Sequence, residues 1–549
     1  MRMARRRGTI RAVGAGLVAA LVLLGACGDD DGDSGADTGG TATETTAAPG
    51  GPTSASEPGS SAAGTPDDID PEGVLRIAYN IQPTVVMFDP TEATSNAHQL
   101  LEAVYDTLLV QTVDGDYEPA LATEATIVDA STIEIELREG VEFSDGTPVD
   151  AEALKFNLER NNEANNQRGL RAEILVALDN VEVTGPLTAT IHLKTPTAGV
   201  FYNLLAGPET MMVSPTAVRA GQDMNKEPVG AGPFLLESAA VESRVVLTKN
   251  PTYWNADQVH LAGMEFIHLL AGPNLLNALN AGQLDMAAIT TTDMDSVRDP
   301  VVAQAFDHPA MVLLNMCKRE GPLSDVRVRQ AMAFATDRDG INQRVFGGRS
   351  EPAWSLRRSA DRFTNPELDG VYERDLDRAA DLLAEAGYAD GFPLGMIVQP
   401  GVSQTVGELL QAQLGEAGID VELQLSSNPL IDFYIEGRQP TFPISHVRAG
   451  LDAWTVLFLP GAFANVCGYS NPELEQSLTR AMALDPASDE AVDAWHEMSE
   501  IVARDLPIIP LVFHVEAQAH NEDRVGGLDY HLSSYGYHIP NLAGVYIKE

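Results

Sequence analysis

A long tract near the N-terminus contributes nothing to a folded core. Residues 28–70 are mostly Gly, Ser, Thr, Ala, Pro and Asp, and no Lys or Arg occurs between Arg11 and Arg76. Such a composition has too little apolar surface to offset the entropy of ordering the chain, and its negative charges repel one another. The sequence therefore predicts a flexible tether over 27–73 and folded structure that begins near Val74.

The segment before the tether has the pattern of an export signal. Arginines cluster within the first 11 residues, and an apolar run from Ala12 to Gly25 follows. That run is shorter than the ~20 residues that span a bilayer. It ends in LGAC, which resembles the lipobox of bacterial lipoproteins and implies removal of residues 1–26 and attachment of lipid to Cys27. The protein would then sit on the outer face of the cytoplasmic membrane, whereas a plain signal peptide with an incidental cysteine is the alternative.

The charge balance excludes one class of partner. The chain has 549 residues, with 35 Lys and Arg against 79 Asp and Glu and a formal net charge of −44. A protein this acidic lacks the basic face that phosphates require, so no nucleic-acid partner is expected. The length exceeds the ~250–300 residues at which single hydrophobic cores stop growing, which predicts more than one lobe.

Apolar periodicity alternates between the strand and the helix pattern. Ile133, Ile135 and Leu137 alternate with polar residues, as in a half-buried strand. Farther along, a helical pattern through Leu410 and Leu414 ends at a glycine and is followed by a strand pattern. Helix, glycine and strand in succession indicate an α/β fold.

Six segments, in order along the chain, resemble motifs of one protein family. They are VYDTLLVQTVDGDYEPALATEATI, IEIELREGVEFSDGTPVDAEALKFNLER, VGAGPFLL, NPTYW, DVRVRQAMAFATDRDGI and DLDRAADLLAEAGYADGF. On these motifs the chain resembles the extracytoplasmic solute-binding proteins of ABC importers, in the large peptide, nickel and opine class called family 5. Four glycines of the motifs, Gly146, Gly230, Gly232 and Gly387, are expected to mark turns and helix ends.

The resemblance implies an α/β fold of two lobes, a type II periplasmic-binding-protein clamp in its large form with a discontinuous first lobe. Lobe I would comprise 74–309 and 510–549, and lobe II would comprise 310–509. Two apolar stretches, Val312–Asn315 and Ile508–Phe513, would cross between the lobes as hinge strands. The lobes would close on a solute by rotation about these crossings.

The resemblance also implies a function. The protein would bind a small solute, an oligopeptide or peptide-like molecule, and deliver it to the permease of an ABC importer, as a monomer without cofactor, metal or catalytic residue. A ligand-sensing receptor of the same fold is an alternative that the sequence leaves open. A lipid-anchored hydrolase is disfavoured, because neither Gly-x-Ser-x-Gly nor His-Glu-x-x-His occurs.

One segment bears on ligand recognition. Peptide-binding members of the family often carry an aspartate that pairs with the amino terminus of the peptide, and the corresponding stretch here is HVRAGLDAWTV. Trp454 stands at the position of that aspartate and Asp452 stands two residues earlier. Because an unpaired buried ammonium is costly, either Asp452 takes over after a local shift or the ligand lacks a free amine. The expected ligand contacts are Phe88, Trp354, His446, Arg448, Asp452 and Trp454, and weaker candidates are Tyr535, Tyr537 and His538.

Two cysteines lie beyond the N-terminal segment, Cys317 and Cys467. Free thiols are unusual outside the cell, although two cysteines are too few for a disulfide scaffold. We therefore expect one disulfide between Cys317 and Cys467, within or beside lobe II.

Overall fold

The computed structural model describes residues 68–79, 88–92, 98–165, 177–240, 243–270, 272–446, 451–462, 464–465, 467–533 and 538–549. The predicted signal segment, Cys27 and most of the tether lie outside these residues, as do Arg448, Tyr535 and Tyr537. Within the described part, no helix is long and apolar enough to cross a membrane.

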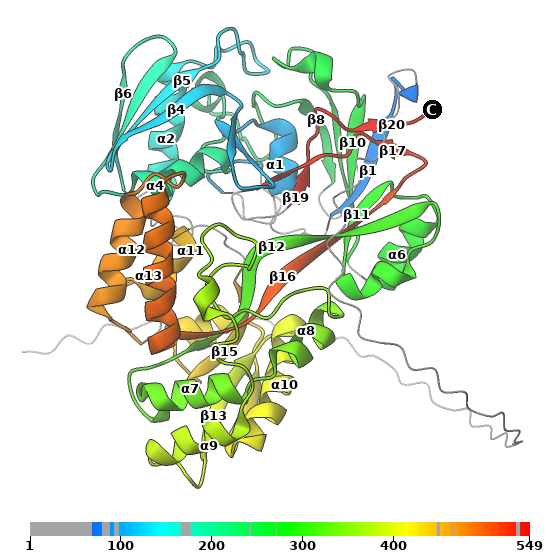
Figure 1. Cartoon of the computed structure of the whole chain (residues 1–549). Coiled ribbons are helices and arrows are strands. Elements are labelled where there is room, and N and C mark those ends of the chain that lie inside the picture. Colours follow the sequence, from blue (N-terminus) through cyan, green and yellow to red (C-terminus); the bar gives the residue numbers. More distant parts are fainter. Residues whose placement is uncertain are drawn as a thin grey trace, which may run out of the picture. The chain divides into compact units, whose positions relative to one another are not determined.

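A mixed sheet runs through the folded part of the chain (Figure 1). Among the described residues it has ten strands, in the order β14 (Ile419–Leu425), β13 (Phe392–Val398), β15 (Thr441–His446), β12 (Val301–Met316), β16 (Ile508–Asn521), β11 (Met286–Ile289), β1 (Val74–Tyr79), β10 (Gly263–His268), β9 (Arg244–Lys249) and β8 (Phe234–Ala240). The sheet therefore joins strands from both ends of the chain.

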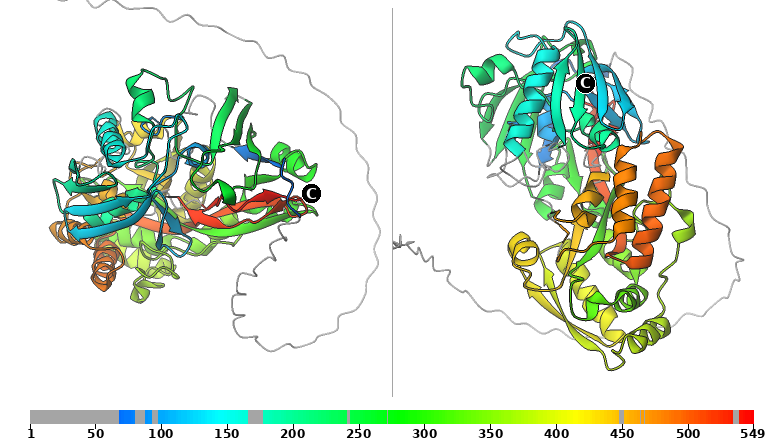
Figure 2. Two further views of the ribbon diagram at one scale, coloured as in Figure 1. Left: turned by 90° about the horizontal axis from the view of Figure 1, so that it is seen from above. Right: turned by 90° about the vertical axis from the view of Figure 1, so that its left-hand side faces the viewer.

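Strands β12 and β16 form the ladder in the middle of this sheet. Val301 pairs with Asn521 at one end and Asn315 pairs with Ile508 at the other. Seen from above, the two strands run side by side over their length (Figure 2, left). The two apolar stretches expected to cross between lobes lie inside these strands and are buried, but the strands extend well beyond them.

Smaller sheets and the helices cover this frame. One sheet has the order β4 (Ala122–Asp129), β5 (Thr132–Leu137), β7 (Thr188–Leu193) and β6 (Leu178–Val183), and another has the order β19 (His538–Pro540), β18 (Tyr530–Leu532), β2 (Leu109–Thr112) and β3 (Tyr117–Pro119). Strands β17 (Val525–Gly526) and β20 (Tyr546–Ile547) pair with each other. The helices are α1 (His98–Val104), α2 (Ala151–Asn165), α4 (Ala198–Asn203), α5 (Pro215–Arg219), α6 (Pro273–Asn280), α7 (Val326–Ala335), α8 (Arg338–Phe346), α9 (Leu376–Glu385), α10 (Val402–Glu416), α11 (Leu451–Phe458), α12 (Pro472–Ala483) and α13 (Asp489–Asp505).

Side chains at helix starts explain several of these boundaries. Asp325, Asp337 and Asp375 each stand directly before a helix and accept a hydrogen bond from a backbone N–H of its first turn. Such caps satisfy donors that have no partner within the helix. Gly387 follows the end of α9 with φ of 87°, a conformation that glycine adopts without strain.

The buried apolar residues form two large clusters. The first contains Leu75 and Ile135 near the start of the folded chain, and the second contains Met332 and Leu410. Helices α11, α12 and α13 contribute to the first cluster, for example through Trp495, although they lie inside the segment assigned to lobe II. In Figure 1, α12 and α13 stand below α4, which α12 contacts. The lobe boundaries stay a prediction.

A disulfide joins the end of β12 to the loop after α11. It links Cys317 and Cys467, whose Cα atoms are 5.3 Å apart and which are 150 residues apart in sequence. The Nε atom of Arg319 donates a hydrogen bond of 3.0 Å to the carbonyl oxygen of Cys467. The loop is thus tied to the end of β12 both by a covalent bond and by a hydrogen bond.

The glycines of the VGAGPF segment have a different role from the one expected. Neither marks a turn with positive φ, in contrast to Gly146. Instead the segment packs directly on the end of α1: the N–H of Gly232 donates to the carbonyl oxygen of Val104 at 2.9 Å. A Cβ on Gly232 would lie 2.4 Å from the carbonyl carbon of Val104. Close backbone approach, and not turn geometry, therefore requires glycine here.

This packing predicts the effect of adding a methyl group. We expect Gly232→Ala to lower the free energy of unfolding by at least about 1–3 kcal/mol, because backbone must move to make room. The control is Gly415→Ala on the exposed side of α10, where no atom lies within 4 Å of the added carbon and a gain of up to about 1 kcal/mol is expected. Equal stability of both variants, measured by urea denaturation, would contradict the packing argument.

Candidate functional site

Two pairs of residues face each other in the part of the ladder that joins the two clusters. Phe306 lies opposite Glu516, and His308 lies opposite His514. Because side chains two residues apart in a strand point to the same face, all four lie on one face of the two strands. We call these four residues the junction face.

Glu516 is the acid of the junction face. Its Oε1 atom lies 3.2 Å from Nε2 of His308, and the side chain is only 11% exposed. Its Oε2 atom accepts a hydrogen bond of 3.2 Å from the backbone N–H of His538 on β19. Burial raises the pKa of the Glu516 carboxyl to about 8, and the hydrogen bond from His538 offsets this only in part. The surroundings therefore disfavour the charged form.

The histidines beside Glu516 are neutral at pH 7. Burial lowers the pKa of His308 well below its usual value and lowers the pKa values of His514 and His538 to about 4. Nδ1 of His308 accepts a hydrogen bond of 3.0 Å from the N–H of Ala310, so this ring carries its proton on Nε2, the nitrogen beside Glu516. Within the described part of the chain, no group of three or more His, Cys, Asp or Glu residues could hold a metal ion.

Aromatic rings surround the same acid. The ring centroids of Tyr530 on β18 and of His538 each lie 4.6 Å from that of Phe306. The rings of His308 and His514 are 5.3 Å apart. Ring faces attract cations and pack well against apolar groups. The junction face and its neighbours thus combine one carboxyl group with several rings.

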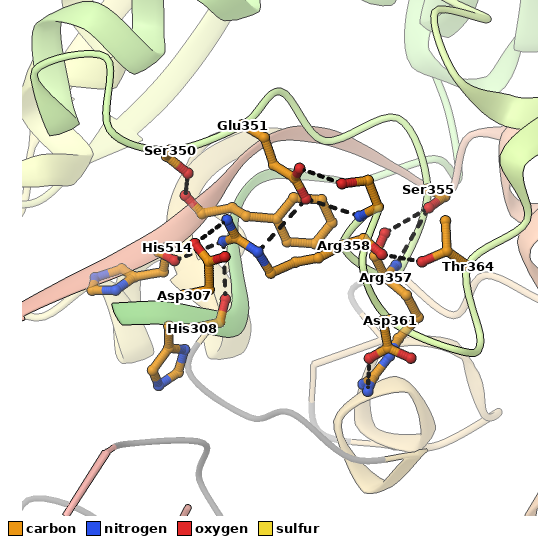
Figure 3. A network of polar contacts seen from close by, with 12 residues as sticks. Asp307, His308, Ser350, Glu351, Ser355, Arg357, Arg358, Asp361, Thr364 and His514 are labelled. Atoms are coloured by element: carbon orange, nitrogen blue, oxygen red, sulfur yellow. Dashed lines mark hydrogen bonds and ion pairs between the residues drawn. The ribbon is translucent and has the colours of Figure 1, made fainter. Parts of the chain in front are cut away.

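Arg358 lies in the segment between α8 and α9 and contacts both strands of the ladder, β12 and β16, as Figure 3 shows. Its guanidinium donates to the carbonyl oxygen of His514 at 3.1 Å and to Oδ1 of Asp307 at 2.5 Å, and it lies 5.4 Å from the ring centre of Phe513. In Figure 3 the imidazole rings of His308 and His514 point away from this guanidinium. Arg358 therefore holds the strands through their backbone and through Asp307.

Two predicted ligand contacts border the ladder at opposite edges. The last residue of β15, His446, pairs with Met311 of β12. At the other edge, the N–H of Ala353 donates to the carbonyl oxygen of Leu511 at 3.0 Å, which places Trp354 next to β16. Trp354 is half-buried and packs against the second cluster. Both positions therefore lie beside the strands that join the clusters.

Two other predicted contacts, Phe88 and Trp454, are buried in the first cluster, with 1% and 2% of their surface exposed. Asp89, next to Phe88, forms two hydrogen bonds of 2.9 and 2.5 Å with Arg160. Trp454 stacks on Phe458 at 5.9 Å. Both side chains thus serve packing, and a role in ligand contact stays a prediction for each.

The remaining predicted contacts are described only in part. Asp452 belongs to the first turn of α11, but its side chain and that of His446 lie outside the described part, and Arg448 lies outside it altogether. Sequence reasoning did not select the four residues of the junction face. The signal was present as polar residues at every second position, His308 in β12 and His514 and Glu516 in β16.

Two further buried acids, Glu102 and Asp106, anchor the region of α1. Burial opposes ionisation of Glu102, but His531 at 2.9 Å and His98 at 2.7 Å outweigh it and lower the pKa of Glu102 well below its usual range. One turn later, burial raises the pKa of Asp106 to about 7, although the indole N–H of Trp254 donates to it at 2.6 Å. These contacts join α1 to β18 and to the NPTYW segment, which explains that motif as structural.

The neutral histidines predict a pH dependence of stability. His514 has a pKa of about 4 in the folded protein and about 6.5 in an unfolded chain. Between these values the unfolded chain binds more protons, so the folded state loses stability as the pH falls. From about pH 7 to about pH 5, we expect the unfolding free energy of the wild type to fall by about 2 kcal/mol more than that of His514→Gln. Urea denaturation at both pH values measures this difference, and His192→Gln on β7 is the control. Equal losses in wild type and His514→Gln would contradict the assignment.

Comparison with solved structures tests the fold. HbpA2 of Haemophilus parasuis superposes with a TM-score of 0.74 at 22% identity, over 87% of this chain and 100% of that chain. The periplasmic binding protein DppA of Helicobacter pylori, solved in complex with the peptide STSA, superposes with a TM-score of 0.71 at 20% identity, over 87% and 98%. The predicted periplasmic-binding-protein fold is thereby confirmed.

Comparison with sequences tests the family. A glutathione-binding protein of Salmonella paratyphi A is 27% identical over 469 residues, which cover 80% of this chain and 89% of that protein. Residues 116–462 match the model of the bacterial extracellular solute-binding proteins, family 5. Because this match spans more than half of the chain, the protein belongs to family 5 of the bacterial extracellular solute-binding proteins and is the solute-binding component of an ABC importer.

Proposed function

We propose that this protein captures a peptide-like solute and is held at the outer face of the cytoplasmic membrane by lipid on Cys27. The observation that carries the solute class is the 27% identity to a glutathione-binding protein, sustained over 80% of this chain. Glutathione is a tripeptide with one amine and two carboxylates. A relative of the same fold was solved with a bound peptide, which agrees with this class.

The junction face is the part of the described structure that best suits this task. It lies on the two strands that join the clusters, and Trp354 and His446 border these strands. Polar groups that are buried at such a place cost free energy, so they are expected where they serve a ligand. The solute would lie against this face, and the two parts of the clamp would close on it.

Ligand binding is expected to raise the melting temperature. A ligand at 100 times its Kd adds about 2.7 kcal/mol to stability. We therefore expect glutathione or members of a panel of di- and tripeptides to raise the Tm by several degrees, whereas their free amino acids, the control, should not. Stabilisation by sugars or by nickel with histidine, and by no peptide, would show that the solute class is wrong.

The anchor has its own test. We expect the wild type to enter the detergent phase on phase separation of a cell lysate, and Cys27→Ser to stay in the aqueous phase, because the thiol that carries the lipid is missing. Ser34→Ala, in the same acidic tract, is the control and should behave as the wild type. If Cys27→Ser still enters the detergent phase, the lipid is not on this residue.

A further inference from the structure

Gly199 in α4 lies directly against the end of α12. A Cβ on Gly199 would lie 1.8 Å from the carbonyl oxygen of Leu484 and 3.2 Å from that of Met482. Beyond the helix that contains Gly199, the three nearest atoms to this Cβ all belong to those two residues. Within a helix, glycine is less favourable than alanine. The end of α12 is therefore what requires glycine at this position.

Helix α13, on which α12 packs, is bound to the part of the chain that forms the second cluster. At its start, the guanidinium of Arg362 donates to the carbonyl oxygens of Ala487 and Ser488 at 3.2 and 3.3 Å. Near its end, the hydroxyl of Tyr372, a residue of the second cluster, donates to the carbonyl oxygen of Ala503 at 2.7 Å. The segment between α8 and α9 thus holds α13 at both ends.

The contact between α12 and α4 is of another kind. No hydrogen bond or ion pair joins these two helices, all of whose residues are described. The polar side chains of α4 bond elsewhere: Tyr202 donates to the carbonyl oxygen of Ala125 on β4 at 3.2 Å, and Asn203 accepts from Tyr117 on β3 at 2.7 Å. A contact without hydrogen bonds can separate without leaving a buried donor unpaired.

We propose that the end of α12, at Met482 and Leu484, rests on Gly199 as a latch that forms when the clamp closes and separates when it opens. Helices α12 and α13 would then move with the second cluster, although their apolar side chains join the first cluster in this structure. This proposal rests on the clamp closure of the proposed function. It assigns control of the closed state to a residue outside the junction face.

The latch would affect the affinity for every solute in the same way. A clamp that binds solute in its closed state has an apparent Kd that rises as the closed fraction falls. Because a Cβ does not lie within 3.0 Å of a non-bonded atom, Gly199→Ala must move α12 and α4 apart by more than about 1 Å. The substitution therefore disfavours the closed state without touching a group of the junction face.

Distances between spin labels test the proposal, measured by electron paramagnetic resonance without added solute. One pair of labels spans the latch, on the exposed Val128 of β4 and Thr479 of α12, and a second pair joins Thr479 to Asp381 of α9. We expect Gly199→Ala to lengthen the first distance by several Å, because rotation of the lobes amplifies a local separation. The second distance should stay unchanged. Gly415→Ala, the matched control in α10, should alter neither distance.

Urea denaturation separates a latch from permanent packing. A Cβ on Gly232 would lie 2.4 Å from the carbonyl carbon of Val104, whereas a Cβ on Gly199 would lie 1.8 Å from its nearest atom. If both contacts were permanent, Gly199→Ala would be the more destabilising change. We expect it to lower the urea midpoint by less than half as much as Gly232→Ala does, because opening of the clamp removes the overlap.

All labelled variants are full-length and carry Cys27→Ser, so that only the introduced thiols react. An unchanged distance between Val128 and Thr479 in Gly199→Ala overturns the proposal. A changed distance between Asp381 and Thr479 also overturns it, because α12 would then not move with the second cluster. Failure of Gly199→Ala to fold, or a loss of stability as large as that of Gly232→Ala, marks permanent packing and has the same consequence. No solute is used, so an error in the proposed solute class leaves these results unaffected.

Discussion

The pairing of β12 with β16 is the constraint on which the rest of the structure depends. The two strands are hydrogen-bonded from Val301 and Asn521 to Asn315 and Ile508, and their residues belong to both large clusters. A buried backbone must satisfy its N–H and C=O groups, and a ladder does this for both strands at once. Strand β15 forms hydrogen bonds with the outer edge of β12, and the segment before Trp354 forms them with the outer edge of β16. Every element of the second cluster is therefore positioned relative to this ladder.

Function and stability make opposite demands on this ladder. The apolar residues of β12 from Met311 to Met316 are all buried. Next to them in the ladder lie three ionisable residues, His308 in β12 and His514 and Glu516 in β16. Burial lowers the pKa values of the two histidines and raises the pKa of Glu516, so the uncharged form of each group is favoured. The protein thus keeps polar side chains at the place where two cores meet. Such departures from an apolar interior are typical of binding sites.

Members of family 5 bind solutes and do not transform them, so this protein is a binding protein and not an enzyme. Family membership does not by itself name the solute, because one fold can carry many sites. The chemistry of individual groups must do that.

Local signals in the sequence determined a large part of this protein. Asp325, Asp337 and Asp375 each stand directly before a helical pattern and begin a helix there, and alternation marks strands such as β5 and β14. Motif resemblance added the family and the two-lobed fold. The disulfide of Cys317 with Cys467 also followed from the number of cysteines and the expected compartment.

Only the tertiary structure decided how distant segments meet. Phe306 and Glu516 are opposite each other although more than 200 residues separate them, and no local pattern specifies that register. The same holds for Gly232, whose need for glycine comes from the backbone of Val104. The sequence by itself determined the elements and the family, because these depend on neighbours along the chain. The tertiary structure determined which residues form the junction face and how burial shifts their pKa values. Both depend on which strands pair and on which side chains this pairing removes from water.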